Sequence, residues 1–517
     1  FIFILGININ IYSFTGGDGS LANPYLISNC NHLQNISLNL SANYELNNNI
    51  DCGVFPHNSG TGFKTIGSCG PISSCWGGGD DIYFNGNFNG NNYTIANLYI
   101  NNISKNGTGL FAIINFTSKI KDFGLINVNI SGYNYIGSLV GLNAGANISN
   151  IYSTGHISGN QSIGGLIGHN SNNIIDGVYS TIDIVGTDYL GGLIGNSDYT
   201  IIKNSHFLGT INGRFILGGL VGYMVRSTIN QSYSSANIVG INNIGGLAGY
   251  MQRGIINQSY SLANIVGINN IGGLVGQIHG GNIYISYSSA NINAVNYTGG
   301  LVGKTRAAYP SKIANSYTKG NINGSNIVGG LVGENLGYTY FIYIENSYSS
   351  GNVNGITSVG GLVGKNIGGT GRSVRNATIN NSFSTSNVTG ITDVGGLVGI
   401  NYNSNSYILN SYWNNHSANP NVGIGSDVNS QLVIAISDNL SYFFFQLNNP
   451  LSIWNTSVWN FADNNLPILS WQPFQNNTNS QIGYVFPFTN NYLLLLIIVS
   501  IFFYFVFPNP IFFFKLK

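Results

Sequence analysis

The chain has 517 residues, of which only 6% are charged, and its formal net charge at pH 7 is +1. This balance, without any run of Lys or Arg, argues against a nucleic-acid partner that is held by charge. The 71 glycines and the many Asn, Ser and Ile residues depart from the composition of an average globular enzyme and favour strands and turns over helices.

The first 15 residues, which begin FIFILGININIYSF, are apolar. They have the character of a secretory signal core, but the chain starts at Phe1 without Met or a basic leader. Residues 1–15 are therefore interpreted as a truncated signal peptide.

Residues 16–108 are predicted to form an N-terminal capping region that contains all the cysteines of the chain: Cys30, Cys52, Cys69 and Cys75. An even number of cysteines in one exported segment suggests two disulfides. The favoured pairs are Cys30 with Cys52 and Cys69 with Cys75, although three pairings exist and thiols are the alternative. No CxxC or His/Cys zinc spacing occurs, so no metal is expected.

Residues 109–412 are predicted to form a repeat array. Residues 256–276 read INQSYSLANIVGINNIGGLVG, and residues 229–249 read INQSYSSANIVGINNIGGLAG. From a variant first copy at Gly137-Ser138, successive pairs follow at intervals of 27 residues six times and then 30, 31 and 35. The Gly-Gly pairs begin at Gly164, Gly191, Gly218, Gly245, Gly272, Gly299, Gly329, Gly360 and Gly395. Such a fixed period indicates a structural unit that stacks on copies of itself.

A second column of residues lies 12 positions before each Gly-Gly pair. Its members are Tyr152, Tyr179, His206, Tyr233, Tyr260, Tyr287, Tyr317, Tyr348 and Phe383. Since the spacing of 12 does not vary, every length change falls between a GLxG sequence and the next column residue. The array therefore tolerates insertions at one corner of the unit.

The unit predicts an all-β fold, a parallel β-helix or β-solenoid of about 10–11 coils with about 27 residues and three short strands per coil. A lone coil buries too few side chains to offset the loss of backbone entropy, about 1–2 kcal/mol per residue. Stacking of parallel coils about 4.8 Å apart would complete the hydrogen bonds and align Leu220, Leu247 and Leu274 in an interior column.

The chain is predicted to end in a C-terminal cap (413–475), a linker (476–491) and a transmembrane helix (492–514). The apolar run from Tyr492 to Phe514 contains no charge and is long enough to cross a bilayer. Lys515 and Lys517 follow it, which places the preceding chain outside the cell as a single-pass surface protein. A lipid-anchor signal is the alternative. About twenty Asn-x-Ser/Thr sequons permit glycosylation, although chance explains over half of them in so Asn-rich a chain.

The GGL[VIA]G core, the unit of about 27 residues and the SYS-type segment resemble the GLUG-motif repeats of bacterial-type surface proteins. These repeats occur in adhesin-like chains and beside some secreted peptidases. The stretches NPYLISNCNHLQ before the array and VWNFADNNLPILSWQ after it are similar to the flanking segments of such arrays, so the resemblance extends over about residues 16–474. It implies an exported, surface-displayed, mostly non-catalytic architecture and no defined ligand.

No catalytic residues are predicted. The 16 acidic residues do not recur in register, no HExxH or GxSxG pattern occurs, and His206 is interpreted as a packing replacement within the aromatic column. Neither an enzyme nor a cofactor is expected.

Positive charge collects at the insertion corner, where nine of the 17 basic residues fall between a GLxG sequence and the next column residue. The predicted ligand-binding residues are Arg226, Arg253, Lys304, Arg306, Tyr309, Tyr340, Arg372 and Arg375. Arginine forks and aromatic rings suit an anionic glycan or cell-surface polymer. The plain alternative is that charges occur wherever loops leave the coil. The hypotheses are accordingly adhesion or recognition, then a structural stalk or coat without a ligand, and third a β-helix polysaccharide-active enzyme.

Overall fold

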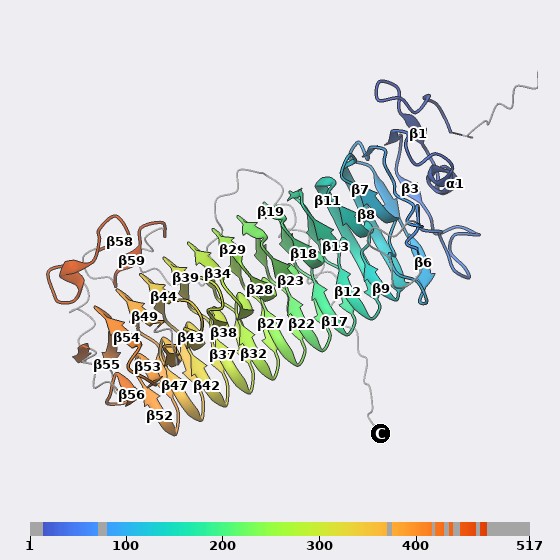
Figure 1. Cartoon of the computed structure of the whole chain (residues 1–517). Helices are drawn as coiled ribbons and strands as arrows, with labels where there is room; N and C mark the ends of the chain where they lie inside the picture. Colours follow the sequence, from blue (N-terminus) through green and yellow to red (C-terminus); the bar gives the residue numbers. More distant parts are fainter. Residues whose placement is uncertain are drawn as a thin grey trace, which may run out of the picture. The chain divides into compact units, whose positions relative to one another are not determined.

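The computed structural model describes residues 14–70, 80–369, 375–415, 419–428, 434–437, 445–461 and 466–472. Within these residues the chain winds into parallel coils that stack along one axis (Figure 1). The all-β parallel solenoid expected from the repeats is therefore confirmed.

Each central coil contributes five short strands to three parallel sheets, rather than the three strands expected. In one coil, β17 (Asp188–Gly191) lies in a ten-strand sheet and β18 (Ile194–Asp198) lies in a twelve-strand sheet. The remaining strands of that coil, β19 (Ile201–Lys203), β20 (His206–Phe207) and β21 (Thr210–Asn212), lie in the third and longest sheet. The sheets are named below by these descriptions.

Each coil contributes one strand to the twelve-strand sheet, so the strands of this sheet give the number of coils among the described residues. Its strands are β7 (Phe111–Asn115), β10 (Val140–Ala144), β13 (Ile167–Ser171), β18, β23 (Val221–Val225), β28 (Ala248–Gln252), β33 (Val275–Ile278), β38 (Val302–Arg306), β43 (Val332–Leu336), β48 (Val363–Ile367), β53 (Val398–Asn401) and β56 (Ile424–Asp427). The prediction of 10–11 coils is thus too low, since the described residues form 12. The coils of β7 and β56 carry no Gly-Gly pair, which is the mark by which units are recognised in the sequence.

The ten-strand sheet lies beside it and ends at the Gly-Gly pairs. Its strands are β9 (Asn134–Ile136), β12 (Gln161–Gly164), β17, β22 (Phe215–Gly218), β27 (Asn242–Gly245), β32 (Asn269–Gly272), β37 (Asn296–Gly299), β42 (Asn326–Gly329), β47 (Thr357–Gly360) and β52 (Thr392–Gly395). At Gly245 a Cβ atom would collide with the carbonyl oxygen of Ala248, and at Gly246 it would collide with the Ser261 side chain. Glycine is needed here because the backbone turns tightly between two sheets.

Identical residues meet in register across neighbouring coils. Leu247 is fully buried, its amide donates to the Leu274 carbonyl at 2.9 Å, and its carbonyl accepts from Leu220 at 2.9 Å. The predicted aromatic column is a continuous ring stack: neighbouring rings lie 4.8–5.0 Å apart within 5° of parallel, and Tyr412 extends it beyond Phe383. His206 occupies its place in this stack, as predicted.

Polar residues also stack in register, which explains the low charge of the chain. The side-chain carboxamide of Asn264 donates a hydrogen bond to the side-chain oxygen of Asn237 at 3.0 Å and accepts one from the side chain of Asn291 at 3.3 Å. A carboxamide both donates and accepts, so an Asn column can continue through any number of coils. A column of identical charges would repel itself.

The N-terminal region continues the parallel pairing into the long sheet. β1 (Tyr25–Ile27), β2 (Tyr44–Leu46) and β4 (Phe88–Asn89) pair in that order and lead to β8 (Lys119–Gly132), which pairs with β11 (Asn147–Ser158). A short helix, α1 (Cys30–Asn35), lies among them.

The structure contains one of the two favoured disulfides in full. Cys30 is bonded to Cys52, as predicted. Cys69 is also disulfide-bonded, and Cys75, its predicted partner, lies outside the described residues. Most of the interpreted signal peptide, residues 1–13, lies outside them as well.

The C-terminal residues 445–461 and 466–472 lie along the side of the solenoid, over the aromatic column. Trp454 packs on Tyr412 with ring centroids 5.3 Å apart, and Trp471 packs on Tyr317 at 5.6 Å. Between them, β58 (Trp459–Asn460) pairs with β59 (Ile468–Leu469). No helix within the described part of the chain is long and apolar enough to span a membrane, and the predicted transmembrane helix at 492–514 lies outside that part.

Candidate functional site

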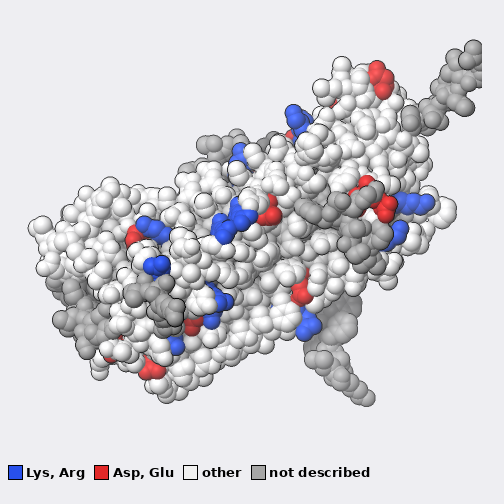
Figure 2. Space-filling view, viewed as in Figure 1, with Lys and Arg blue, Asp and Glu red and all other residues white. Residues whose placement is uncertain are grey.

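The predicted binding residues gather where the strands of the twelve-strand sheet end. We call this region the insertion edge: the last residues of these strands and the loops that follow them. Register places Asp198, Val225 and Gln252 in one column, and continuing the pairing by one residue beyond β33 aligns His279 with Arg306. Arg226 and Arg253 follow directly in the adjacent column. Figure 2 shows Lys and Arg at several separate places along the visible face, some of them beside Asp or Glu.

Each arginine that the structure describes on this edge lies on an aromatic ring. The guanidinium carbons lie 3.5–5.2 Å from the ring centroids, in the pairs Arg226 with Tyr199, Arg253 with Tyr309, Arg306 with Tyr338, and Arg375 with Phe341. Arg226 also donates a hydrogen bond to the Tyr199 hydroxyl. A ring beneath a guanidinium fixes its plane and leaves N–H groups at the edge of that plane for an anionic oxygen.

The rings of the edge extend into a chain that we call the aromatic path. Its members are Tyr189, Tyr223, Tyr250, His279, Tyr309 and Tyr340, and the successive ring centroids lie 5.3–6.3 Å apart. The Tyr250 hydroxyl and His279 Nδ1 are 2.6 Å apart, which makes this contact a hydrogen bond. Tyr309 fits because Gly280 has no side chain: a Cβ atom on Gly280 would lie against the Tyr309 ring.

The surroundings of Tyr250 and His279 favour the uncharged form of both side chains. Burial raises the pKa of Tyr250 to about 12, with the neighbouring Tyr223 adding to the effect. Burial, followed by the positive charge of Arg306, lowers the pKa of His279. At neutral pH Tyr250 and His279 are therefore uncharged, and the arginines supply positive charge at the edge.

Lys304 is placed differently from the arginines. Its ammonium forms an ion pair of 2.9 Å with the buried Glu334, which is also in register with Lys365 in the next coil. All four ion pairs among the described residues use lysines. The Lys304 charge is thus partly balanced inside the protein, and Lys304 is a weaker candidate for ligand binding than Arg253 or Arg306.

The structure brings together most of the predicted residues and adds others. Arg226, Arg253, Lys304, Arg306, Tyr309, Tyr340 and Arg375 all lie on the insertion edge, whereas Arg372 lies outside the described residues. Tyr199, Tyr250 and His279 were not predicted. Periodicity could have found two of them, since Tyr199 precedes Arg226 by one 27-residue unit and Tyr250 follows Tyr223 by one.

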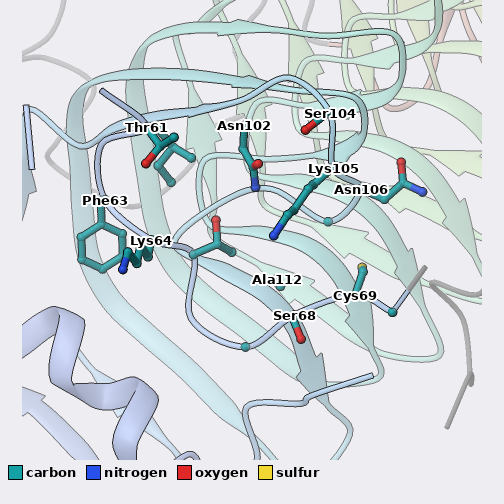
Figure 3. A pocket seen from close by; sticks show the side chains of 15 residues that line it. Thr61, Phe63, Lys64, Ser68, Cys69, Asn102, Ser104, Lys105, Asn106 and Ala112 are labelled. Atoms are coloured by element: carbon teal, nitrogen blue, oxygen red, sulfur yellow. The ribbon is translucent and has the colours of Figure 1, made fainter. Parts of the chain in front are cut away.

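A separate pocket of about 840 Å³ lies in the N-terminal region. Asn102 and Lys105 point toward its interior, and Lys64 and Ser68 also contribute to its lining (Figure 3). One stretch of the lining ends at Gly70, immediately before residues 71–79, which are not described. We assign no function to this pocket.

The fold and the repeated columns define the chain as a parallel β-solenoid of stacked repeats. The model of the GLUG motif matches residues 132–158, which span β9, β10 and β11. The resemblance to GLUG-repeat proteins is therefore confirmed.

Two curated proteins share part of the sequence. A Gly-rich membrane protein of Evansella cellulosilytica is 31% identical over 143 residues, which are 27% of this chain and 15% of that protein. Halomucin of Haloquadratum walsbyi is 30% identical over 147 residues, which are 27% of this chain and 2% of that protein. The matched regions thus span less than a fifth of either relative.

Solved structures add only a distant likeness. A protein from Bacteroides ovatus described as an immunoglobulin A1 protease aligns over 89% of this chain and 96% of its own, with 16% identity and a TM-score of 0.24. A second structure, described as an IgA1 protease, aligns over 75% of this chain and 21% of its own, with 18% identity and a TM-score of 0.23. Similarity this low carries no argument about activity.

Proposed function

We propose that the chain is a non-catalytic cell-surface protein that acts in adhesion or recognition and binds anionic glycans or surface polymers at the insertion edge. The observation that carries this proposal is the set of four arginines stacked on aromatic rings at one edge of the solenoid. Tyr199, Tyr338, Tyr340 and Phe341 are each at least 37% exposed, so a ligand can reach this edge. Recognition residues are usually presented by loops on a rigid scaffold.

The relatives support the location. One is named as a membrane protein and the other is named Halomucin, and the GLUG motif resembles repeats of exported proteins. In this proposal the segment 492–514 anchors the chain in the membrane, the solenoid lies outside the cell, and sequons such as Asn387 are glycosylation sites.

A structural stalk or coat is the second candidate. The ring stack, the Leu column and the Asn columns all serve axial stacking, and a stalk needs nothing more than these. The third candidate, a polysaccharide-active enzyme, would release products from a bound glycan.

A glycan array separates the three hypotheses. We would apply the full-length chain, purified in detergent, at low and at high ionic strength. Salt-sensitive retention of uronate- or sulfate-bearing glycans is the expected result, because exposed charge pairs are screened by salt. An absence of binding to every glycan would favour the stalk, and the release of shorter products would favour the enzyme.

Variants test whether the insertion edge is responsible. Replacement of Arg226, Arg253 and Arg306 together by Ser should abolish retention with little change in melting temperature, as exposed substitutions rarely exceed about 0.5 kcal/mol. The control replaces Lys64, Lys105 and Arg214 by Ser, which removes the same charge from exposed positions outside the insertion edge. Equal losses of glycan retention in both variants would show that binding depends only on the net charge of the chain.

A further inference from the structure

The spacing of the arginines along the insertion edge is determined by the separation of the coils. The ring stack gives the separation of successive coils directly, as 4.8–5.0 Å between ring centroids. Arg226 follows β23 and Arg253 follows β28, one coil further along. Arg306 ends β38, two coils beyond Arg253, and Arg375 follows β48, two coils beyond Arg306. The four arginines therefore extend over five coil steps, about 24 Å at the spacing of parallel strands.

The aromatic path runs in the same direction as this row. Tyr223, Tyr250 and His279 follow one another on consecutive coils, and Tyr309 and Tyr340 continue the path into the insertion loops. Three of its rings interact with the arginines: Arg253 lies on Tyr309, and Arg306 acts electrostatically on both Tyr250 and His279. Rings and guanidinium groups thus form one strip that is parallel to the solenoid axis.

We infer that the ligand is a linear, unbranched anionic glycan, which lies along this strip with its chain parallel to the solenoid axis. The inference rests on the proposed function and specifies its ligand class. One coil step is close to the length of one sugar residue in an extended chain, so carboxylates or sulfates that recur along the chain can meet successive arginines. Sugar rings can lie against the aromatic path between these charges.

A compact or monovalent anion would use one Arg–aromatic pair and gain nothing from the others. A linear chain engages further pairs at high effective concentration once the first is bound. Affinity should therefore rise with chain length until the ligand spans Arg226 to Arg375, and then level off. We expect a total gain of at least about a hundredfold between the shortest and the spanning oligomer, within the range usual for linked sites.

The test is a length series of oligogalacturonates, from the disaccharide to the dodecasaccharide, titrated against the full-length chain in detergent. The expected result is a rise in affinity followed by a plateau. In the double variant Arg226→Ser and Arg375→Ser the plateau should be reached with shorter oligomers, whereas Arg214→Ser, outside the strip, should leave the length profile unchanged.

The alternative results overturn different statements. Measurable affinity that does not depend on length would refute the axial arrangement and leave the proposed function standing. Failure of every oligogalacturonate to bind, while branched anionic glycans are retained on the array, would refute the linear ligand class alone. Tighter binding of single-stranded DNA of equal length would refute a glycan ligand, and retention of no anionic glycan at all would remove the proposed function itself.

Discussion

The interior Leu column offers the sharpest test of the packing. Leu247 is fully buried and lies between Leu220 and Leu274 in the neighbouring coils. In Leu247→Asp the burial of an aliphatic side chain is lost, at about 2–3 kcal/mol. A carboxyl at this position would have to stay neutral at pH 7 against an ordinary pKa near 4, at about 4 kcal/mol more. The sum, roughly 6 kcal/mol, is comparable to the whole stability of many domains.

Because coils contact only their neighbours, this loss should open the mutated coil and spread to both adjacent ones. Hydrogen–deuterium exchange should show faster exchange around Leu220, Leu247 and Leu274, accompanied by a lower melting temperature. Leu247→Val is the matched control, with a loss of about 1 kcal/mol and local effects. If Leu247→Asp melts and exchanges like the parent, residue 247 does not face the core and the assigned phase of the strands is wrong.

Two further predictions concern the surface columns. Burial lowers the pKa of His206 to about 4 in the folded chain, whereas His206 in the unfolded chain has its ordinary pKa of 6.5. The unfolded chain therefore binds a proton at His206 more readily than the folded chain does. The contribution of the neutral His206 to stability is complete above pH 6.5 and is lost as the pH falls toward 4. The variant His206→Tyr matches the neighbouring Tyr179 and Tyr233 and does not titrate in this range. On acidification to pH 5, its free energy of unfolding should therefore rise relative to that of the parent by on the order of 1 kcal/mol. Urea midpoints that shift equally in both proteins would contradict this. Asn264→Asp should cost about 1 kcal/mol at neutral pH because a carboxylate cannot donate to Asn237, and the loss should diminish in acid, where a protonated carboxyl can donate. A loss that is the same at both pH values would show that the missing hydrogen bond is not the cause.

The parts of the fold in which residues stack on their own copies in neighbouring coils can be predicted from the sequence. The ring stack, the Leu column and the single insertion corner could all be predicted, because each is a statement about positions one period apart. The coil of β56 lies beyond the predicted array of 109–412, because it lacks the Gly-Gly pair by which units are recognised in the sequence. The packing of Trp471 on Tyr317 at the side of the stack is a contact that no period encodes.

The candidate site was only partly predictable for the same reason. The position of Arg253 follows from the repeat, but its pairing with Tyr309 depends on a loop two coils away that folds over Gly280. Lys304 shows the opposite case: it was predicted to bind a ligand, and its charge is partly balanced by Glu334. Loop conformation and ion pairing across coils of unequal length do not follow from periodicity.

The most direct test of the proposal is a hydrogen–deuterium exchange footprint of the full-length chain with and without the dodecagalacturonate. Protection should appear in peptides that contain Arg226, Arg253 and Arg306, and the ten-strand sheet around Gly191 should exchange unchanged. Protection confined to other faces of the solenoid, in the presence of measurable binding, would contradict the assignment of the insertion edge as the binding surface.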